Sequence, residues 1–165
     1  MTIIDKKRRG LEPDGGFTLV EMMVALIVIA ILVAIAIPTF LSARERTSNR
    51  AAQAKAQTAV KAHKAQAAAG QDPADTPTLI DDLEDMEPAV TFKDFADYSP
   101  TEVKGVVYVR VEDDPSLGKV VKLVAESTIS GKCFWTRDIN GVTSYATTEC
   151  PNEPTTETQW SLKGW

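Results

Sequence analysis

One carboxylate stands where a carboxylate is costly. Glu21 lies at the edge of an apolar stretch, and the sequence from Met22 to Ala43 contains no charged side chain. A charge in the apolar core of a membrane is unfavourable, so this acid needs a partner or a function. The alternative is a carboxylate near the water interface that interacts favourably with the positive end of a helix.

A second candidate for chemistry is the backbone just before this stretch. Gly15 and Gly16 form a small-residue pair, followed by Phe17, and a polar leader with four basic residues precedes them. A secretory signal peptide places its cleavage site after its apolar region. Here the small residues come first, so a cut between Gly16 and Phe17 would leave the apolar stretch on the mature chain.

The remaining reactive residues form no catalytic pattern. His63 is the only histidine, and without a second histidine or a CxxC pair it is expected to be a packed residue, with no metal site. The acidic residues between positions 71 and 100 lack the spacing of a calcium loop and are interpreted as a solvated connector. The sequence also has no glycine-rich phosphate loop and no nucleophile elbow. We therefore expect no enzyme activity and no cofactor.

Composition and cysteine use bound the compartment and the partners. The formal net charge is −5, which does not support nucleic acid as a partner, although a local basic patch stays open. The basic leader predicts that the N-terminus is cytoplasmic and the rest is exported, while three arginines at positions 44, 46 and 50 weaken this charge asymmetry. In an exported domain Cys133 and Cys150 are expected to form a disulfide, with free thiols as the alternative.

The apolar stretch is predicted to be the first half of one long helix. About 20 apolar residues suffice to cross a bilayer, and good helix formers continue from Arg44 to Ala69, where Gly70 signals the end. A helix over residues 17–69 would be about 80 Å long, so its second half must lie outside the bilayer. Pro38 cannot donate to the carbonyl of Ala34, which predicts a kink.

A sheet is predicted to cover the second half of this helix. Small or apolar residues recur on one helical face, whereas three lysines are expected to stay in water: the face is Ala52, Ala56, Val60, His63 and Ala67, and the lysines are Lys55, Lys61 and Lys64. From Val103 onward the pattern changes to period two, which predicts four strands joined by short turns, at 103–111, 119–126, 132–137 and 142–147. The fold class is therefore α+β, a long N-terminal helix packed on a four-stranded antiparallel sheet. Residues 78–86 are predicted to form one or two helical turns, and the tail after Cys150 either packs on the sheet or stays loose.

The residues from Gly16 to Glu21, GFTLVE, resemble the prepilin peptidase site of type IV pilins and of the related pseudopilins. The resemblance implies that a membrane peptidase cuts after Gly16 and that Phe17 becomes N-methylated. It implies that Glu21 acts in assembly by pairing with the methylated amine of Phe17 on a neighbouring subunit. Pro38 also falls where many pilins carry a helix-bending proline.

The same resemblance implies an organisation and a function. The parts are a cleaved leader (1–16), an apolar transmembrane or filament-core helix (17–43), an exposed helix half (44–69), a connecting loop (70–102), a disulfide-bonded sheet head (103–150) and a tail (151–165). The protein is expected to be a major, type IVa-like pilin precursor, held as a single-pass protein in the cytoplasmic membrane and then assembled into a surface pilus for adhesion, motility or DNA uptake. Its partners would be copies of itself, the prepilin peptidase, and the assembly platform with its ATPase. The alternatives are a pseudopilin of a type II secretion system, a minor pilin and a membrane-anchored binding domain.

Overall fold

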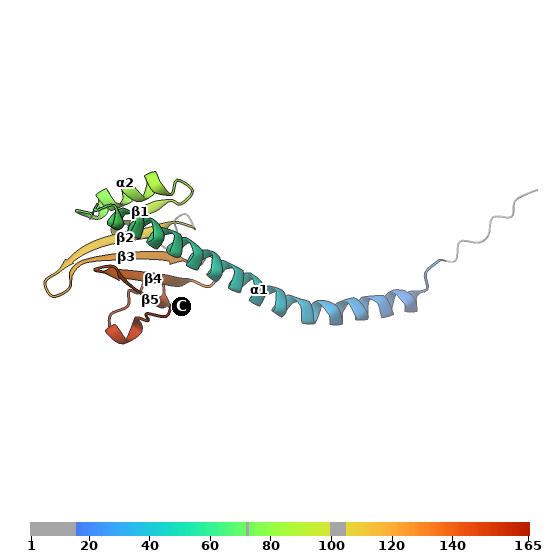
Figure 1. The fold of residues 1–165 in the computed structure, drawn as a ribbon. Coiled ribbons are helices and arrows are strands. Elements are labelled where there is room, and N and C mark those ends of the chain that lie inside the picture. Colours follow the sequence, from blue (N-terminus) through green and yellow to red (C-terminus); the bar gives the residue numbers. More distant parts are fainter. Residues whose placement is uncertain (1–15, 72, 100–104) are drawn as a thin grey trace, which may run out of the picture. The chain divides into compact units, whose positions relative to one another are not determined.

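The computed structural model describes residues 16–71, 73–99 and 105–165. The chain divides into two compact units, one ending at Phe40 and the other running from Leu41 to Trp165. We describe each unit by itself. Figure 1 shows the elements along the chain.

The long helix α1 spans Leu19–Ala68 and has 50 residues, close to the predicted 17–69. It ends where the sequence predicts, because Gly70 adopts a φ of 79°, which glycine tolerates best. The amide of Gly70 donates to the carbonyl of Ala67 and that of Gln71 to Gln66. These two bonds form a Schellman motif, which satisfies carbonyls at the helix end.

The sheet has five strands in the order β1-β2-β3-β4-β5. Strands β2 to β5 are antiparallel neighbours and correspond to the four predicted strands. They span Val107–Asp114, Gly118–Glu126, Lys132–Ile139 and Val142–Glu149. Within the described residues β2 begins later than the predicted residue 103, and β2, β4 and β5 each end later than predicted. Residues 103 and 104 lie outside the described residues. Asn140 and Gly141 both have positive φ, 52° and 82°, as a tight hairpin turn between β4 and β5 requires.

The predicted connecting loop contains regular structure, which corrects the prediction of four strands and of one or two helical turns. Helix α2 spans Thr76–Met86 with 11 residues, and β1, Phe92–Asp94, pairs in parallel with β2. A short 3-10 helix, Phe95–Asp97, follows. Asp75 caps α2 by accepting from the amide of Thr78 at 2.9 Å, and the leucines of α2 provide its burial against the core, Leu79 and Leu83.

The core of the second unit lies between the C-terminal part of α1 and one face of the sheet (Figure 1). The helix contributes mainly alanines, and the sheet contributes larger side chains, including Val107, Val109, Leu123 and Phe134. Because alanine has only a methyl group, the helix axis can approach the sheet closely. The interface therefore gains fit rather than large burial per residue.

Two predictions about this helical face are wrong. Ala67 is exposed and Gln66 is buried instead, because the side-chain amide of Gln66 reaches the carboxylate of Asp82 on α2. Lys55 is half-buried, since its Nζ donates to the carbonyl of Gly105 at 2.8 Å. Lys61 and Lys64 are exposed, as predicted.

The tail packs on the sheet, which settles the alternative left open by the sequence. Ser161 and Tyr145 exchange two backbone hydrogen bonds of 2.8 Å at the free edge of β5. The Trp165 indole packs against Phe134 and Tyr145 and donates to the carbonyl of Ala146 at 2.9 Å. The tail thus covers part of an edge that could otherwise pair with another chain.

Ion pairs hold the middle of the tail on the opposite face of the sheet. Glu153 contacts both Arg110 and Lys122, and Glu112 contacts the same two cations. Burial would raise the pKa of Glu112, but the hydrogen bond and charge of Lys122, with Arg110, hold that pKa below its usual value. These four side chains join β2, β3 and the tail.

A second pair fixes the tail nearer its end. The Arg137 guanidinium donates to both carboxylate oxygens of Glu157, at 2.6 and 2.7 Å. This hydrogen bonding lowers the pKa of the Glu157 carboxyl. The same guanidinium lies 4.5 Å from the centre of the Trp160 ring, so one arginine positions a short 3-10 helix, Glu157–Gln159, and the residue after it.

Candidate processing and assembly site

The residues proposed for processing precede α1. Gly16 is exposed, and a Cβ built on it would meet nothing within 4 Å. Phe17 is also exposed, with 81% of its surface accessible. Nothing within the described chain therefore demands a glycine at position 16. A demand for glycine would have to come from a molecule that binds this backbone closely.

Glu21 closes the first turn of α1. Its Oε2 accepts from both the amide and the hydroxyl of Thr18, each at 3.3 Å. The hydroxyl of Thr18 in turn accepts from the amide of Glu21 at 3.2 Å. This reciprocal arrangement is a capping box, which satisfies two amides that the helix cannot bond itself. Sequence reasoning missed it, although Thr18-x-x-Glu21 is its signature.

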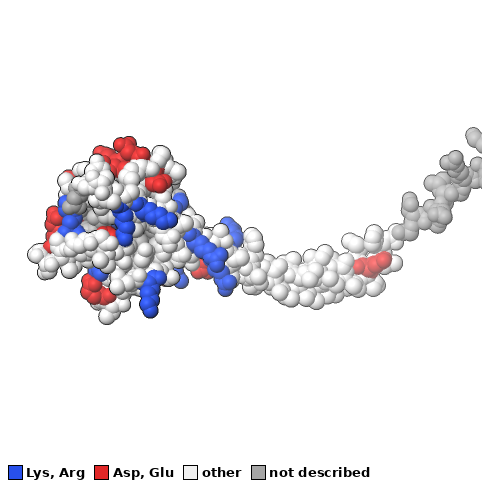
Figure 2. Space-filling view, viewed as in Figure 1, with Lys and Arg blue, Asp and Glu red and all other residues white. Residues whose placement is uncertain are grey.

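The apolar part of α1 is exposed along its whole length. Every side chain from Gly16 to Phe40 is exposed, and Figure 2 shows the stretch as uncharged beyond the acid near its start. The length and apolar composition of α1 suffice to cross a membrane. An apolar surface this large marks a site of contact with a membrane or another protein. The large exposed residues here are Phe17, Leu19, Val20, Met22, Met23, Val24, Leu26, Ile27, Val28, Ile29, Ile31, Leu32, Val33, Ile35, Ile37 and Phe40.

Pro38 lies inside α1, which continues through it. The proline has no amide to donate to the carbonyl of Ala34. The hydroxyl of the next residue, Thr39, donates to the carbonyl of Ile35 at 3.1 Å. A kink at Pro38 stays a prediction.

Cys133 and Cys150 are joined, with their Cα atoms 5.1 Å apart. Cys133 lies in β4, and Cys150 follows β5 directly. The bond therefore closes the last hairpin and anchors the start of the tail.

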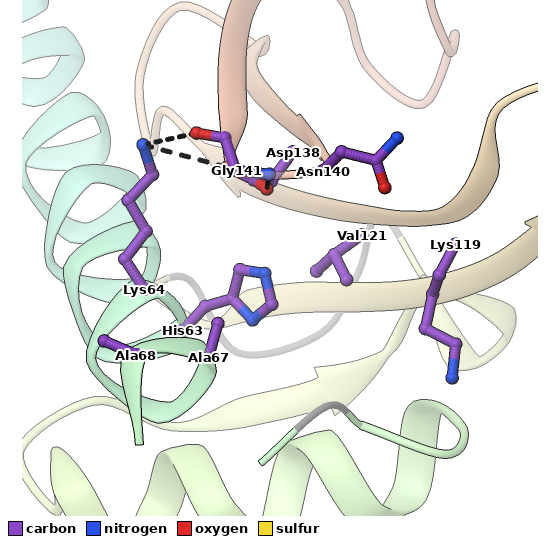
Figure 3. A pocket seen from close by; sticks show the side chains of 9 residues that line it. All are labelled: His63, Lys64, Ala67, Ala68, Lys119, Val121, Asp138, Asn140 and Gly141. Carbon is purple, nitrogen blue, oxygen red and sulfur yellow. Dashed lines mark hydrogen bonds and ion pairs between the residues drawn. The ribbon is translucent and has the colours of Figure 1, made fainter. Parts of the chain in front are cut away.

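One cavity of about 460 Å³ lies beside the end of α1 (Figure 3). Lys64 reaches across it, donating to the carbonyl of Gly141 at 3.3 Å and lying 3.8 Å from the carboxylate of Asp138. Asp138 also accepts from the amide of Gly141 and the hydroxyl of Thr143. His63 is 5% exposed, as predicted for a packed residue. The contacts of Lys64 with Asp138 and Gly141 join the helix to the β4–β5 turn.

The described residues contain no group of three or more side chains suited to a metal ion. The ion pairs of the second unit join its own elements.

Residues 13–37 match the family described as the prokaryotic N-terminal methylation motif. No curated protein and no solved structure matches the chain. The motif supports a type IV pilin or pseudopilin family member and indicates a structural subunit. The methylation motif and the long apolar N-terminal helix together fit the type IV pilin, or prepilin, family.

Proposed function

We propose that this chain is the precursor of a major structural subunit of a type IV pilus. A prepilin peptidase removes residues 1–16, Phe17 becomes N-methylated, and the apolar part of α1 holds the subunit in the cytoplasmic membrane. The assembly platform and its ATPase then move the subunit into a filament on the cell surface.

The observation that carries the proposal is the combination of the motif at Gly16–Glu21 with an apolar helical segment that is exposed along its whole length. In water this surface would be unstable as it stands. A bilayer covers it before assembly, and the same segments of neighbouring subunits cover it afterwards. One segment thus serves both as an anchor and as the filament core.

Glu21 is proposed to act in the transfer from the membrane to the filament. Its carboxylate is already engaged by Thr18, so the amine of a neighbouring Phe17 must share or replace that contact. A buried ion pair adds little net stability, because desolvation offsets much of the attraction. It penalises wrong axial positions, however, because both charges then stay unpaired.

Surface filaments should be compared in cells with and without the gene, using antibodies against residues 41–165. We expect labelled filaments only when the gene is present. Cleaved protein confined to the cell envelope, together with loss of protein secretion in the deletion strain, would instead identify a pseudopilin. Uncleaved protein without filaments would identify an anchored binding domain and overturn the proposal.

A further inference from the structure

The second unit has an uncovered notch at the start of its helix. We call it the basal notch and define it by the five residues that line its volume of about 290 Å³: Leu41, Ser42, Arg44, Glu45 and Ile129. Four of these belong to α1, and Ile129 belongs to the turn between β3 and β4. Ile129 is 49% exposed, so its apolar side chain is open to a partner.

The turn that carries Ile129 is fixed to the helix. The Ser48 hydroxyl lies 2.8 Å from that of Ser127 and 2.9 Å from that of Thr128. The Ser130 hydroxyl donates to the side-chain oxygen of Asn49 at 2.6 Å. Bonds on both sides of Ile129 therefore hold it at a set level on α1.

The helical period explains why the notch lies there. Leu41, Arg44, Glu45 and Ser48 lie on one face, because residues three and four apart share a face. At Ser48 this face becomes buried against the turn. In the two turns before Ser48 the face is exposed, and Ile129 lines it from the far side of the notch.

The sequence places this level at the edge of a bilayer. The apolar stretch runs from Phe17 to Phe40, just before Leu41, and its length lies within the range of about 17–25 residues for a membrane-spanning helix. Arg44, Glu45 and Arg46 are the first charged residues after Glu21. Leu41 and Ile129 thus offer apolar surface where acyl chains end, and the arginines offer cations where lipid phosphates begin.

We propose that the basal notch docks on the outer surface of the cytoplasmic membrane. Ile129 enters the interfacial layer of lipid, and Arg44, Arg46 and Arg50 face anionic headgroups, with Glu45 as the opposing charge. This rests on the membrane-held precursor of the proposed function. It also gives a role to the three arginines that weaken the charge asymmetry of the span, since they bind lipid on the exported side.

The full chain should be reconstituted in vesicles of phosphatidylethanolamine and phosphatidylglycerol, with an environment-sensitive fluorophore at Ile129→Cys while the native disulfide stays closed. The matched control is Leu117→Cys, since Leu117 is 42% exposed and lies in the turn at the other end of β3. A third label at Ile29→Cys reports insertion of the span. We expect a blue shift and severalfold protection from aqueous iodide at position 129, none at 117, and the strongest protection at 29.

Equal, water-like signals from positions 129 and 117, with position 29 inserted, would overturn the docking while leaving the anchor intact. Protection at 129 that appears only in isolated filaments would assign the notch to a neighbouring subunit and also overturn it. A water-like signal at 29 would remove the membrane premise and the docking together. Filament formation is scored separately, so docking without filaments would count against the proposed function alone. In vesicles of phosphatidylcholine we expect a smaller shift, because the arginines lose their anionic partners.

Discussion

The two parts of α1 differ in how much of their surface is buried. From Met22 to Phe40 the helix carries no charge and is exposed on all sides, whereas from Ser48 to Gln66 a narrow face of mostly small residues is buried against the sheet. The second part packs on the sheet of its own chain. The second unit, Leu41–Trp165, which we call the head from here on, can therefore be specified by its own sequence. The first part is exposed throughout, which is the physical basis for proposing that a membrane and then a filament cover it.

From this difference we expect that Gly16 matters only to external partners. Gly16→Val should abolish cleavage and leave the precursor in the membrane, because a peptidase must approach this backbone closely. The head should unfold at an unchanged temperature, since a Cβ added at position 16 would meet no described atom within 4 Å. Immunoblots of membrane fractions measure the precursor, and efficient cleavage of the variant would contradict this assignment.

Two substitutions of Glu21 test whether assembly needs its charge or its capping hydrogen bond. Glu21→Ala removes both, whereas Glu21→Gln keeps the capping box, because glutamine also occupies that position. We expect both variants to be cleaved and inserted, and both to form few or no filaments. Sheared-filament yield measures this in strains without a wild-type copy. Normal yield from Glu21→Gln would assign Glu21 to the helix start alone, and normal yield from Glu21→Ala would remove its role.

The disulfide belongs to the self-contained part, so its removal should weaken the head. Closing a loop with a sequence separation of 17 stabilises by about 3 kcal/mol in the chain-entropy description. Cys133→Ala with Cys150→Ala should lower the free energy of unfolding by about that amount, measured by denaturant titration followed by tryptophan fluorescence. Cleavage after Gly16 should be unaffected. An unchanged denaturation midpoint would show that the tail and hairpin are held by the other contacts.

The alanine face should tolerate little added volume. Ala56 is 0% exposed, and leucine there should destabilise the head by about 1 to 3 kcal/mol through overpacking. Ala54→Leu, on an exposed position of the same helix, is the control and should change stability by less than about 0.5 kcal/mol. Equal effects of the two substitutions on thermal unfolding would contradict the close packing of helix and sheet.

The smallest expected effect is the acid response of the tail contacts. The pKa of Glu112 is lowered from 4.5, so its stabilisation is present above about pH 4.5 and is lost as the pH falls through the lower, folded-state pKa. Because its side chain is 39% exposed, the contribution should stay under about 1 kcal/mol. Glu112→Gln should flatten the stability curve in that acid range, whereas exposed Asp113→Asn should not. Parallel curves for wild type and Glu112→Gln would exclude this contribution.

Strong local signals made much of the fold predictable. The apolar run, the stop at Gly70 and the Asn140-Gly141 turn act through nearby residues, and four strands and the helix follow from them. Strand β1 was not predicted, because three residues are too few to show the alternation of apolar and polar side chains that indicates a strand. Helix α2 was underestimated because prolines suggested a loop, although Asp75 and the proline that follows Thr76 begin a helix well.

The candidate site shows the same division. The roles of Gly16, Phe17 and Glu21 are implied by the resemblance to the prepilin peptidase site, and they stay predictions. The capping box was also readable, since it needs only Thr18 and Glu21. The burial of Gln66 in place of Ala67 and the partial burial of Lys55 could not be predicted from the sequence. They depend on contacts with Asp82 and Gly105, which lie far along the chain.

We propose that a cut before the apolar segment leaves this segment at the N-terminus of the mature subunit, where lipid or neighbouring subunits cover it. Mass spectrometry of the N-terminal peptide from sheared filaments tests this proposal. We expect a chain that starts at Phe17 and carries one N-methyl group on it. A chain that starts at Met1, or one cut after the apolar stretch, would contradict it.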